Sequence, residues 1–173
     1  MPNPIEKTAS QTAGAAKAVG ARLKGLVGVF NTLAKEHGEV SALLMRAKST
    51  NDPAKQQDIW QKIRVELLSH ERAELAEVYP ELEKYADTRD IALRHQAEAE
   101  QLETAVQRVE ATSFGTDDWH QSLRSLTDLV KHHVDEEEKS FFPRAMGTLD
   151  KDIARDLDQR FRLTKDAIKA ELA

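Results

Sequence analysis

The sequence predicts an all-α protein, an up-down-up-down four-helix bundle with an N-terminal helical extension and a fifth, C-terminal helix. Apolar residues recur in alternating steps of three and four over most of the 173 residues, which is the period of a bundle helix. Aromatic residues make up only 5% of the chain and charged residues 32%, with 7 glycines and 5 prolines. The stretches between the periodic segments are short, which favours antiparallel neighbours.

Residues 1–22 are small and polar and predict a weak N-terminal helical extension. We expect the bundle over residues 23–147 and a C-terminal helix packed on it over residues 148–173. The first apolar seam comprises Val19, Leu23, Leu26, Phe30, Leu33, His37, Val40 and Leu44. Asp52 is the predicted N-cap of the second helix and Pro53 opens its first turn.

The later helices carry the same pattern. Their seams are Ile59, Ile63, Leu67, His70, Glu74 and Val78; Ile91, His95, Glu98, Leu102, Ala105 and Val109; Trp119, Leu123, Leu126, Val130, His133, Glu137 and Phe141; and Ile153, Leu157, Phe161, Thr164, Ile168 and Leu172. Pro80 is expected to kink or end the second helix, because proline lacks the amide donor. Asp87-Thr88 and Thr116 are predicted capping signals, and the fifth helix is expected to follow from Asp150.

One motif occurs twice. His70-x-x-x-Glu74 and His133-x-x-x-Glu137 each place an imidazole and a carboxylate on one helix face, since residues four apart are neighbours. In both copies an aromatic residue and then a proline follow nine and ten residues after the histidine, as Tyr79-Pro80 and Phe142-Pro143. The other two helices each contribute one seam histidine, His37 and His95, at a matching height.

These groups predict a metal site at mid-bundle. Buried carboxylates and imidazoles without partners are costly, and a cation offsets that cost. Nitrogen and carboxylate ligands suit iron, manganese or zinc better than calcium or magnesium. Two glutamates from opposite helices can bridge two metal ions, with histidines completing each coordination sphere.

Taken together, the residues resemble the hemerythrin-like HHE cation-binding domain family over about residues 28–147. The resemblance rests on His37, on the two His-x-x-x-Glu motifs with their aromatic-proline pairs, and on His95. It implies a non-haem di-iron centre, bridged by both glutamates and by an oxo or hydroxo group, with an open position for dioxygen, nitric oxide or peroxide. Iron is favoured over manganese and zinc, although the ligands themselves accept either iron or manganese.

The chain departs from the oxygen carriers of that family. Their second histidine on the third helix is Ala99 here, and their aspartate five residues after the last histidine is replaced by Glu137 at four. One histidine fewer weakens the case for reversible oxygen carriage. Glu98 lies on the seam one turn from His95, either as an added ligand or as a hydrogen-bond partner of an imidazole. The predicted metal-binding residues are His37, His70, Glu74, His95, His133, Glu137 and Glu98.

Other polar residues near the motif are assigned to the surface or to packing. His132, His120 and Glu71 are expected to be exposed. Tyr79 and Phe142 are expected to pack beneath the site rather than to take part in redox chemistry.

Three functions follow from this centre. The first is binding of dioxygen, nitric oxide or peroxide for sensing or for oxidative and nitrosative protection. The second is enzymatic turnover of peroxide or nitric oxide, catalase-like or nitric-oxide-reducing, and the third is an iron-responsive interaction scaffold. The net charge is −5, with +4 on residues 1–35, so the acidic body gives no reason to expect nucleic acid. Without a membrane-spanning run or a signal-peptide pattern, we expect a cytoplasmic protein. The second apolar side of the N-terminal helix is open to three covers: the fifth helix, a homodimer or protein partner, or an anionic lipid surface.

Overall fold

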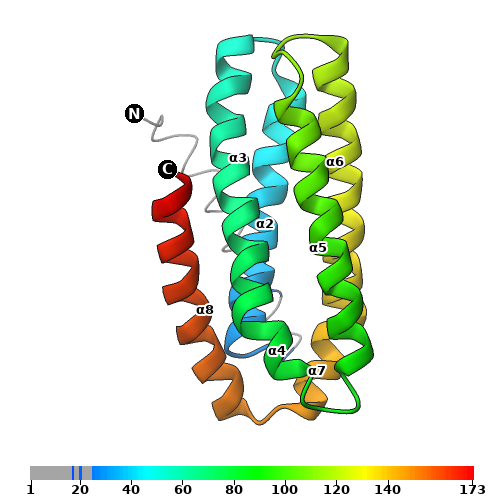
Figure 1. Ribbon diagram of the computed structural model, residues 1–173, viewed down its shortest axis with the longest axis vertical. Coiled ribbons are helices and arrows are strands. Elements are labelled where there is room, and N and C mark those ends of the chain that lie inside the picture. The colour runs from blue at the N-terminus through cyan, green and yellow to red at the C-terminus, as the bar shows by residue number, and fades with distance from the viewer. Residues whose placement is uncertain (1–16, 18–19, 21–24) are drawn as a thin grey trace.

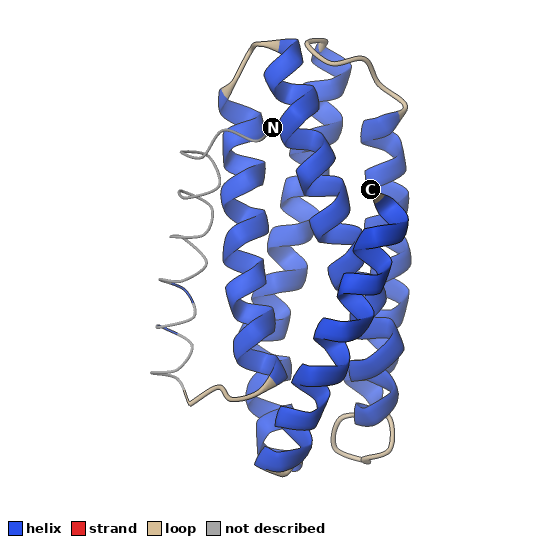
Figure 2. Cartoon of the chain, turned by 90° about the vertical axis from the view of Figure 1, so that its left-hand side faces the viewer, coloured by secondary structure: helices blue, strands red, loops and turns tan. Residues whose placement is uncertain are grey.

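The all-α prediction is confirmed by a computed structural model, which describes residues 17, 20 and 25–173 (Figure 1). Its long helices are α2 Val29–Ser49, α3 Pro53–Ala73, α5 Arg89–Glu110, α6 Asp117–Glu136 and α8 Lys151–Leu172, and its short ones are α4 Tyr79–Leu82 and α7 Phe142–Thr148. The described part of the chain contains no strand, as Figure 2 shows. Apart from residues 17 and 20, the predicted extension over residues 1–22 lies outside the described residues, and so do the seam positions Val19 and Leu23.

The long helices lie side by side. Contacts join α2 to α3, α5 to α6, α2 to α6 and α3 to α5. The fifth long helix, α8, lies along α3 and α2 on one side of the bundle (Figure 1). None of the described helices is long and apolar enough to cross a membrane.

The core is divided into two apolar clusters. One contains Phe30, Tyr79, Phe141, Phe142 and Phe161, and the other contains Trp60, Trp119, Leu123 and their neighbours. The four seam histidines fall between these clusters along their helices, so a polar layer separates two apolar layers. All predicted seam residues of the first helix from Leu26 onward are buried.

Most predicted helix starts are confirmed by their hydrogen bonds. The Asp52 side chain accepts from the amide of Ala54 at 3.0 Å, and Asp150 accepts from the amide of Asp152 at 2.7 Å. Thr116 accepts from the amide of Trp119 at 3.2 Å. Thr88 does precede α5, but its hydroxyl donates to the Leu82 carbonyl at 2.6 Å and makes no cap, so that part of the prediction was wrong.

Two π-helical segments interrupt the helices at the motif. They are η1 Glu74–Val78 and η2 Glu137–Phe141, and each starts at the glutamate of a His-x-x-x-Glu motif. The amide of the residue after each segment bonds the carbonyl of that glutamate, five positions back. After each segment comes one aromatic residue and then a proline, and the wide turn relieves the clash that the proline ring would make with the carbonyl four residues earlier. The helical path therefore continues to Leu82, so of the two expected effects of Pro80 the end of the helix is wrong.

Gly28 sets the approach of α8 to the start of α2. Its φ of 57° and ψ of −136° belong to a backbone region that residues with a side chain rarely adopt. A Cβ at this position would lie 2.2 Å from the Ala154 carbonyl oxygen. Only glycine therefore fits at this junction without moving α8.

Candidate metal centre

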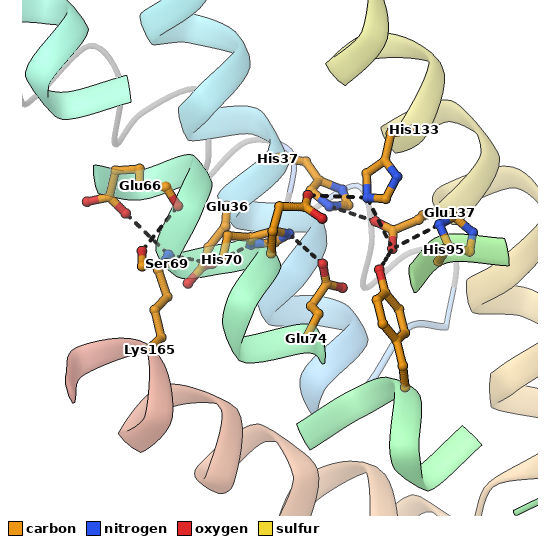
Figure 3. Close-up of polar contacts among 12 residues, drawn as sticks. Glu36, His37, Glu66, Ser69, His70, Glu74, His95, His133, Glu137 and Lys165 are labelled. Atoms are coloured by element: carbon orange, nitrogen blue, oxygen red, sulfur yellow. Dashed lines mark hydrogen bonds and ion pairs between the residues drawn. The ribbon is translucent and has the colours of Figure 1, made fainter. Parts of the chain in front are cut away.

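The four seam histidines converge at mid-bundle from four different helices (Figure 3). His37 on α2, His70 on α3, His95 on α5 and His133 on α6 are each 3% exposed. They form two pairs, with ring centroids 5.1 Å apart for His37 and His70 and 5.0 Å apart for His95 and His133.

Both motif glutamates lie between these rings and are fully buried. Glu137 Oε2 is 3.0 Å from His37 Nε2, and Glu137 Oε1 is 3.7 Å from His133 Nε2. Glu74 Oε2 is 3.2 Å from His70 Nε2. The amide of each glutamate bonds the carbonyl of its motif histidine four residues earlier, so a regular helical turn places the carboxylate on the same face as the imidazole.

Carboxylates outside the centre bond the outward-facing Nδ1 atoms of His37, His70 and His133. Nδ1 is 2.8 Å from Glu138 in His37 and 2.8 Å from Glu36 in His70. When Nδ1 donates to a carboxylate, Nε2 carries a free lone pair and points inward. This carboxylate–histidine arrangement is the one that orients histidine ligands in metal sites.

Glu98 takes a third outer position. Its Oε2 lies 3.1 Å from Nδ1 of His95 and 3.2 Å from Nδ1 of His133, and its side chain is 21% exposed. The structure thus brings Glu98 against both histidines but on the outer side of His133. This geometry favours the hydrogen-bonding alternative for Glu98.

Glu71 is the residue that sequence reasoning missed. It was expected to be exposed, but it is 2% exposed, and its Oε1 lies 3.3 Å from His133 Nε2. A signal was present, because Glu71 lies four residues after the buried Leu67 and three before Glu74, which is again bundle spacing. His132 behaves as predicted, with its side chain 66% exposed.

Tyr79 is buried as expected, and it also makes a polar contact with the centre. Its hydroxyl donates to Glu137 Oε1 at 3.2 Å, and its ring stacks on His95 with centroids 5.9 Å apart. Phe142 stacks on His37 at 5.8 Å, in line with its predicted packing role. The aromatic rings keep this side of the centre apolar.

In the metal-free centre, burial and close charges shift the pKa values of several ionisable groups. Burial raises the pKa of Glu74 to about 7, and the neighbouring charge of Glu137 adds to the effect. Burial opposes charge on His70, but Glu74 and Glu36 nevertheless raise its pKa to about 10. Burial likewise disfavours charge on Glu137, yet His133 and His37 hold its pKa below the usual range.

The unpartnered atoms provide a test of whether a cation fits. The following buried atoms have no hydrogen-bond partner: Nε2 of His37, His70 and His133, Nδ1 of His95, both oxygens of Glu74, and Oε2 of Glu71 and of Glu137. Buried polar atoms are rarely left unpaired, and here eight of them belong to one cluster. Three sets of these residues lie close enough to share an ion: His37, His70 and Glu137; Glu74, His133 and Glu137; and His70, Glu71 and Glu74. A fourth set adds the hydrogen-bonded Glu98 to His95 and His133. The residues present therefore fit bound metal.

Comparison with known proteins agrees with this geometry. The family model described as the hemerythrin HHE cation binding domain matches residues 28–145. The chain belongs to this family. The match spans α2 to α7 and includes all four seam histidines and both motif glutamates, whereas α8 lies beyond it.

One curated relative of this HHE protein is named a DNA nickase and comes from Nostoc sp. (strain PCC 7120 / SAG 25.82 / UTEX 2576). The two are 23% identical over 144 residues, which cover 83% of this chain but 41% of the relative. The chain thus spans less than half the length of that protein. No solved structure matches the chain significantly.

Proposed function

We propose that this chain is a non-haem di-iron protein that binds dioxygen, nitric oxide or peroxide in sensing or in oxidative and nitrosative protection. The observation that carries the proposal is the group of buried, unpartnered nitrogen and oxygen atoms at mid-bundle. We also infer that α2, α3, α5 and α6 alternate in direction, which their short connections support. The cytoplasmic location expected from the sequence stays a prediction.

The clusters support two ion positions that share carboxylates. His37, His70 and Glu137 would hold one ion, and Glu74, His133 and Glu137 the other, with His95 beside the second. Glu74 also approaches His70, so both motif glutamates can bridge. Glu71 adds a carboxylate oxygen beside His133, in a set that has one histidine fewer than the oxygen carriers.

Bound iron would supply Lewis acidity and an electron store for a small oxidant. The chain's own residues prepare the site for it. Glu36 and Glu138 orient His70 and His37, Tyr79 donates a hydrogen bond to Glu137 Oε1, and phenylalanine rings exclude water.

The adjacent histidines His132 and His133 offer a matched pair for the test. We expect wild-type protein reconstituted anaerobically with ferrous iron to hold about two irons per chain and to develop an oxo-to-iron absorption band in air. His133→Ala should lose at least one iron and the band, whereas His132→Ala should keep both. Wild-type protein that holds no iron and melts unchanged on adding iron would refute the proposal, and manganese retained in preference to iron would correct the metal.

Turnover of peroxide or nitric oxide is the second candidate, because two redox ions held at this buried centre would be able to exchange electrons with either molecule. Peroxide disproportionation needs no external electron donor, whereas nitric-oxide reduction requires a reducing partner, since the chain has no cysteine. Oxygen release from peroxide by the loaded protein, lost in His133→Ala, would favour turnover over binding. The scaffold alternative predicts partner binding that depends on iron without any such turnover.

The name of the Nostoc relative adds nicking of DNA as an outcome to be tested. Two metal ions about 4 Å apart can support phosphodiester cleavage. The net charge of −5 does not favour a polyanionic partner. Conversion of supercoiled plasmid to the open circle by loaded wild-type protein, and not by His133→Ala, would change the assignment to a nuclease.

A further inference from the structure

Lys165 is a buried lysine that lies outside the four helices carrying the histidines. It belongs to α8 and is 5% exposed. Its Nζ lies 2.6 Å from Glu36 Oε2 and 3.2 Å from Glu66 Oε2. Lysine usually extends its amine to water, so an amine that is buried against neighbouring helices needs a carboxylate or another acceptor there.

The contact continues into the candidate metal centre. The same oxygen of Glu36 that receives Lys165 also lies 2.8 Å from Nδ1 of His70 (Figure 3). One carboxylate oxygen thus joins an α8 lysine to an imidazole whose Nε2 faces the centre. Four residues earlier on the same α8 face, the Phe161 ring meets the His70 ring edge-on, with centroids 5.8 Å apart.

We propose that Lys165 is a positioning residue for the metal centre, holding Glu36 so that His70 presents Nε2 to its metal ion. This inference rests on the proposed metal binding. Without Lys165, Glu36 loses its cationic partner and is free to turn toward water. The imidazole then loses the acceptor that fixes its orientation, and such outer partners are worth about 10–100-fold in metal affinity.

The other α8 contacts point the same way. Arg160 and Thr164 both bond Glu77, at 3.1 Å and 2.8 Å, inside the π-helical segment that begins at Glu74. α8 therefore touches both the histidine and the turn that carries the glutamate of the same motif. The helix beyond the family match is part of the metal centre's support.

The support is unequal on the two sides of the centre. Glu138, which bonds His37, lies 3.1 Å from Lys17, so both outer carboxylates of the His37 and His70 pair meet a lysine. Within the described ranges, no lysine or arginine forms an ion pair with Glu98 on the His95 and His133 side. Loss of Lys165 should therefore weaken one metal position selectively.

The test compares Lys165→Met with Lys169→Met in the full-length chain. Lys169 lies one turn further along α8 and pairs with Glu66 at 2.6 Å but not with Glu36, so it is a matched control. Metal-free protein is titrated anaerobically with ferrous iron, and stepwise affinities are measured. Lys165→Met should bind one ion as wild type does and the other at least 10-fold more weakly. Lys169→Met should match wild type, and Lys165→Arg should recover part of the loss.

A second measurement needs no metal. In wild type the Nδ1 proton of His70 should give a slowly exchanging NMR resonance because Glu36 holds it; the resonance should disappear in Lys165→Met and persist in Lys169→Met. Equal iron titrations in all variants, or parallel loss of both ions with a collapsed melting curve, would overturn the positioning role. Wild-type protein that binds no iron while the resonance pattern holds would refute the metal proposal and leave the contact as a feature of the fold alone.

Discussion

Glu74→Gln should have opposite effects on the metal-free and metal-loaded protein. In the metal-free fold Glu74 is fully buried and neither of its oxygens has a hydrogen-bond partner. Burial, with the charge of Glu137, raises its pKa from 4.5 to about 7. The folded chain therefore holds this proton more tightly than the unfolded chain, and stability falls as the pH rises from 4.5 through 7. That change corresponds to about 3 kcal/mol above pH 7.

Glutamine keeps the shape and a carbonyl oxygen for His70 but removes the charge. At pH 8 the metal-free variant should be about 1–3 kcal/mol more stable than wild type, with Tm higher by about 5 °C. At pH 4.5 the two should unfold alike. The exposed Glu100 supplies the control, since Glu100→Gln should change nothing at either pH.

Adding iron should make wild type more stable than Glu74→Gln. Ligand at 100 times its Kd stabilises a fold by about 2.7 kcal/mol, and a variant without a bridging carboxylate should gain much less. Chemical denaturation of wild type and Glu74→Gln, with and without ferrous iron and at both pH values, measures these free energies of unfolding. If the metal-free variant is no more stable than wild type at pH 8, Glu74 is not a strained carboxylate. If iron stabilises wild type and Glu74→Gln equally, Glu74 is not a metal ligand.

Three further predictions concern single contacts. Tyr79→Phe removes the hydrogen bond to Glu137 and should cost about 1 kcal/mol in chemical denaturation while shifting the iron absorption band; an unchanged band would separate Tyr79 from the centre. Gly28→Ala should lower Tm by several degrees, because its Cβ would meet the Ala154 carbonyl, and fluorescence-monitored melting measures this. Asp52→Ala should cost about 1 kcal/mol in urea unfolding through loss of the N-cap, and it should leave iron content unchanged, since the cap lies at the other end of α3.

The sequence was sufficient to predict the all-α class and the convergence of four histidines and two glutamates. Periodicity does this reliably, because a seam residue has one direction in which to point. Glu71 shows where the argument stops: it lies against His133 of α6, so α3 buries a wider face toward the bundle than the single seam predicts. The spacing of Glu71 from Leu67 and Glu74 carried that signal, but a carboxylate is normally assigned to solvent.

Lys165 was missed for a different reason, because its burial depends on residues of helices remote in the sequence. Its position on α8 follows Phe161 by one turn, but a lysine there is normally assigned to solvent. The carboxylates of Glu36 on α2 and Glu66 on α3 make that place polar. Thr88 illustrates a smaller limit, because its hydroxyl could accept from an amide as an N-cap or donate to a carbonyl, and it donates to that of Leu82.

The two wide turns also determine what lies beneath the metal layer. Nine residues of regular helix carry a side chain about 180° around the axis, which would place Tyr79 on the side away from His70. The additional residue absorbed at Glu74 brings the phenol back under the imidazoles, where it meets Glu137. The same holds for Phe142 below His37. A strict 3.6-residue count carried past these turns would displace later positions by about 100° around the axis. The aromatic residues beneath the metal layer therefore depend on one extra residue in each turn.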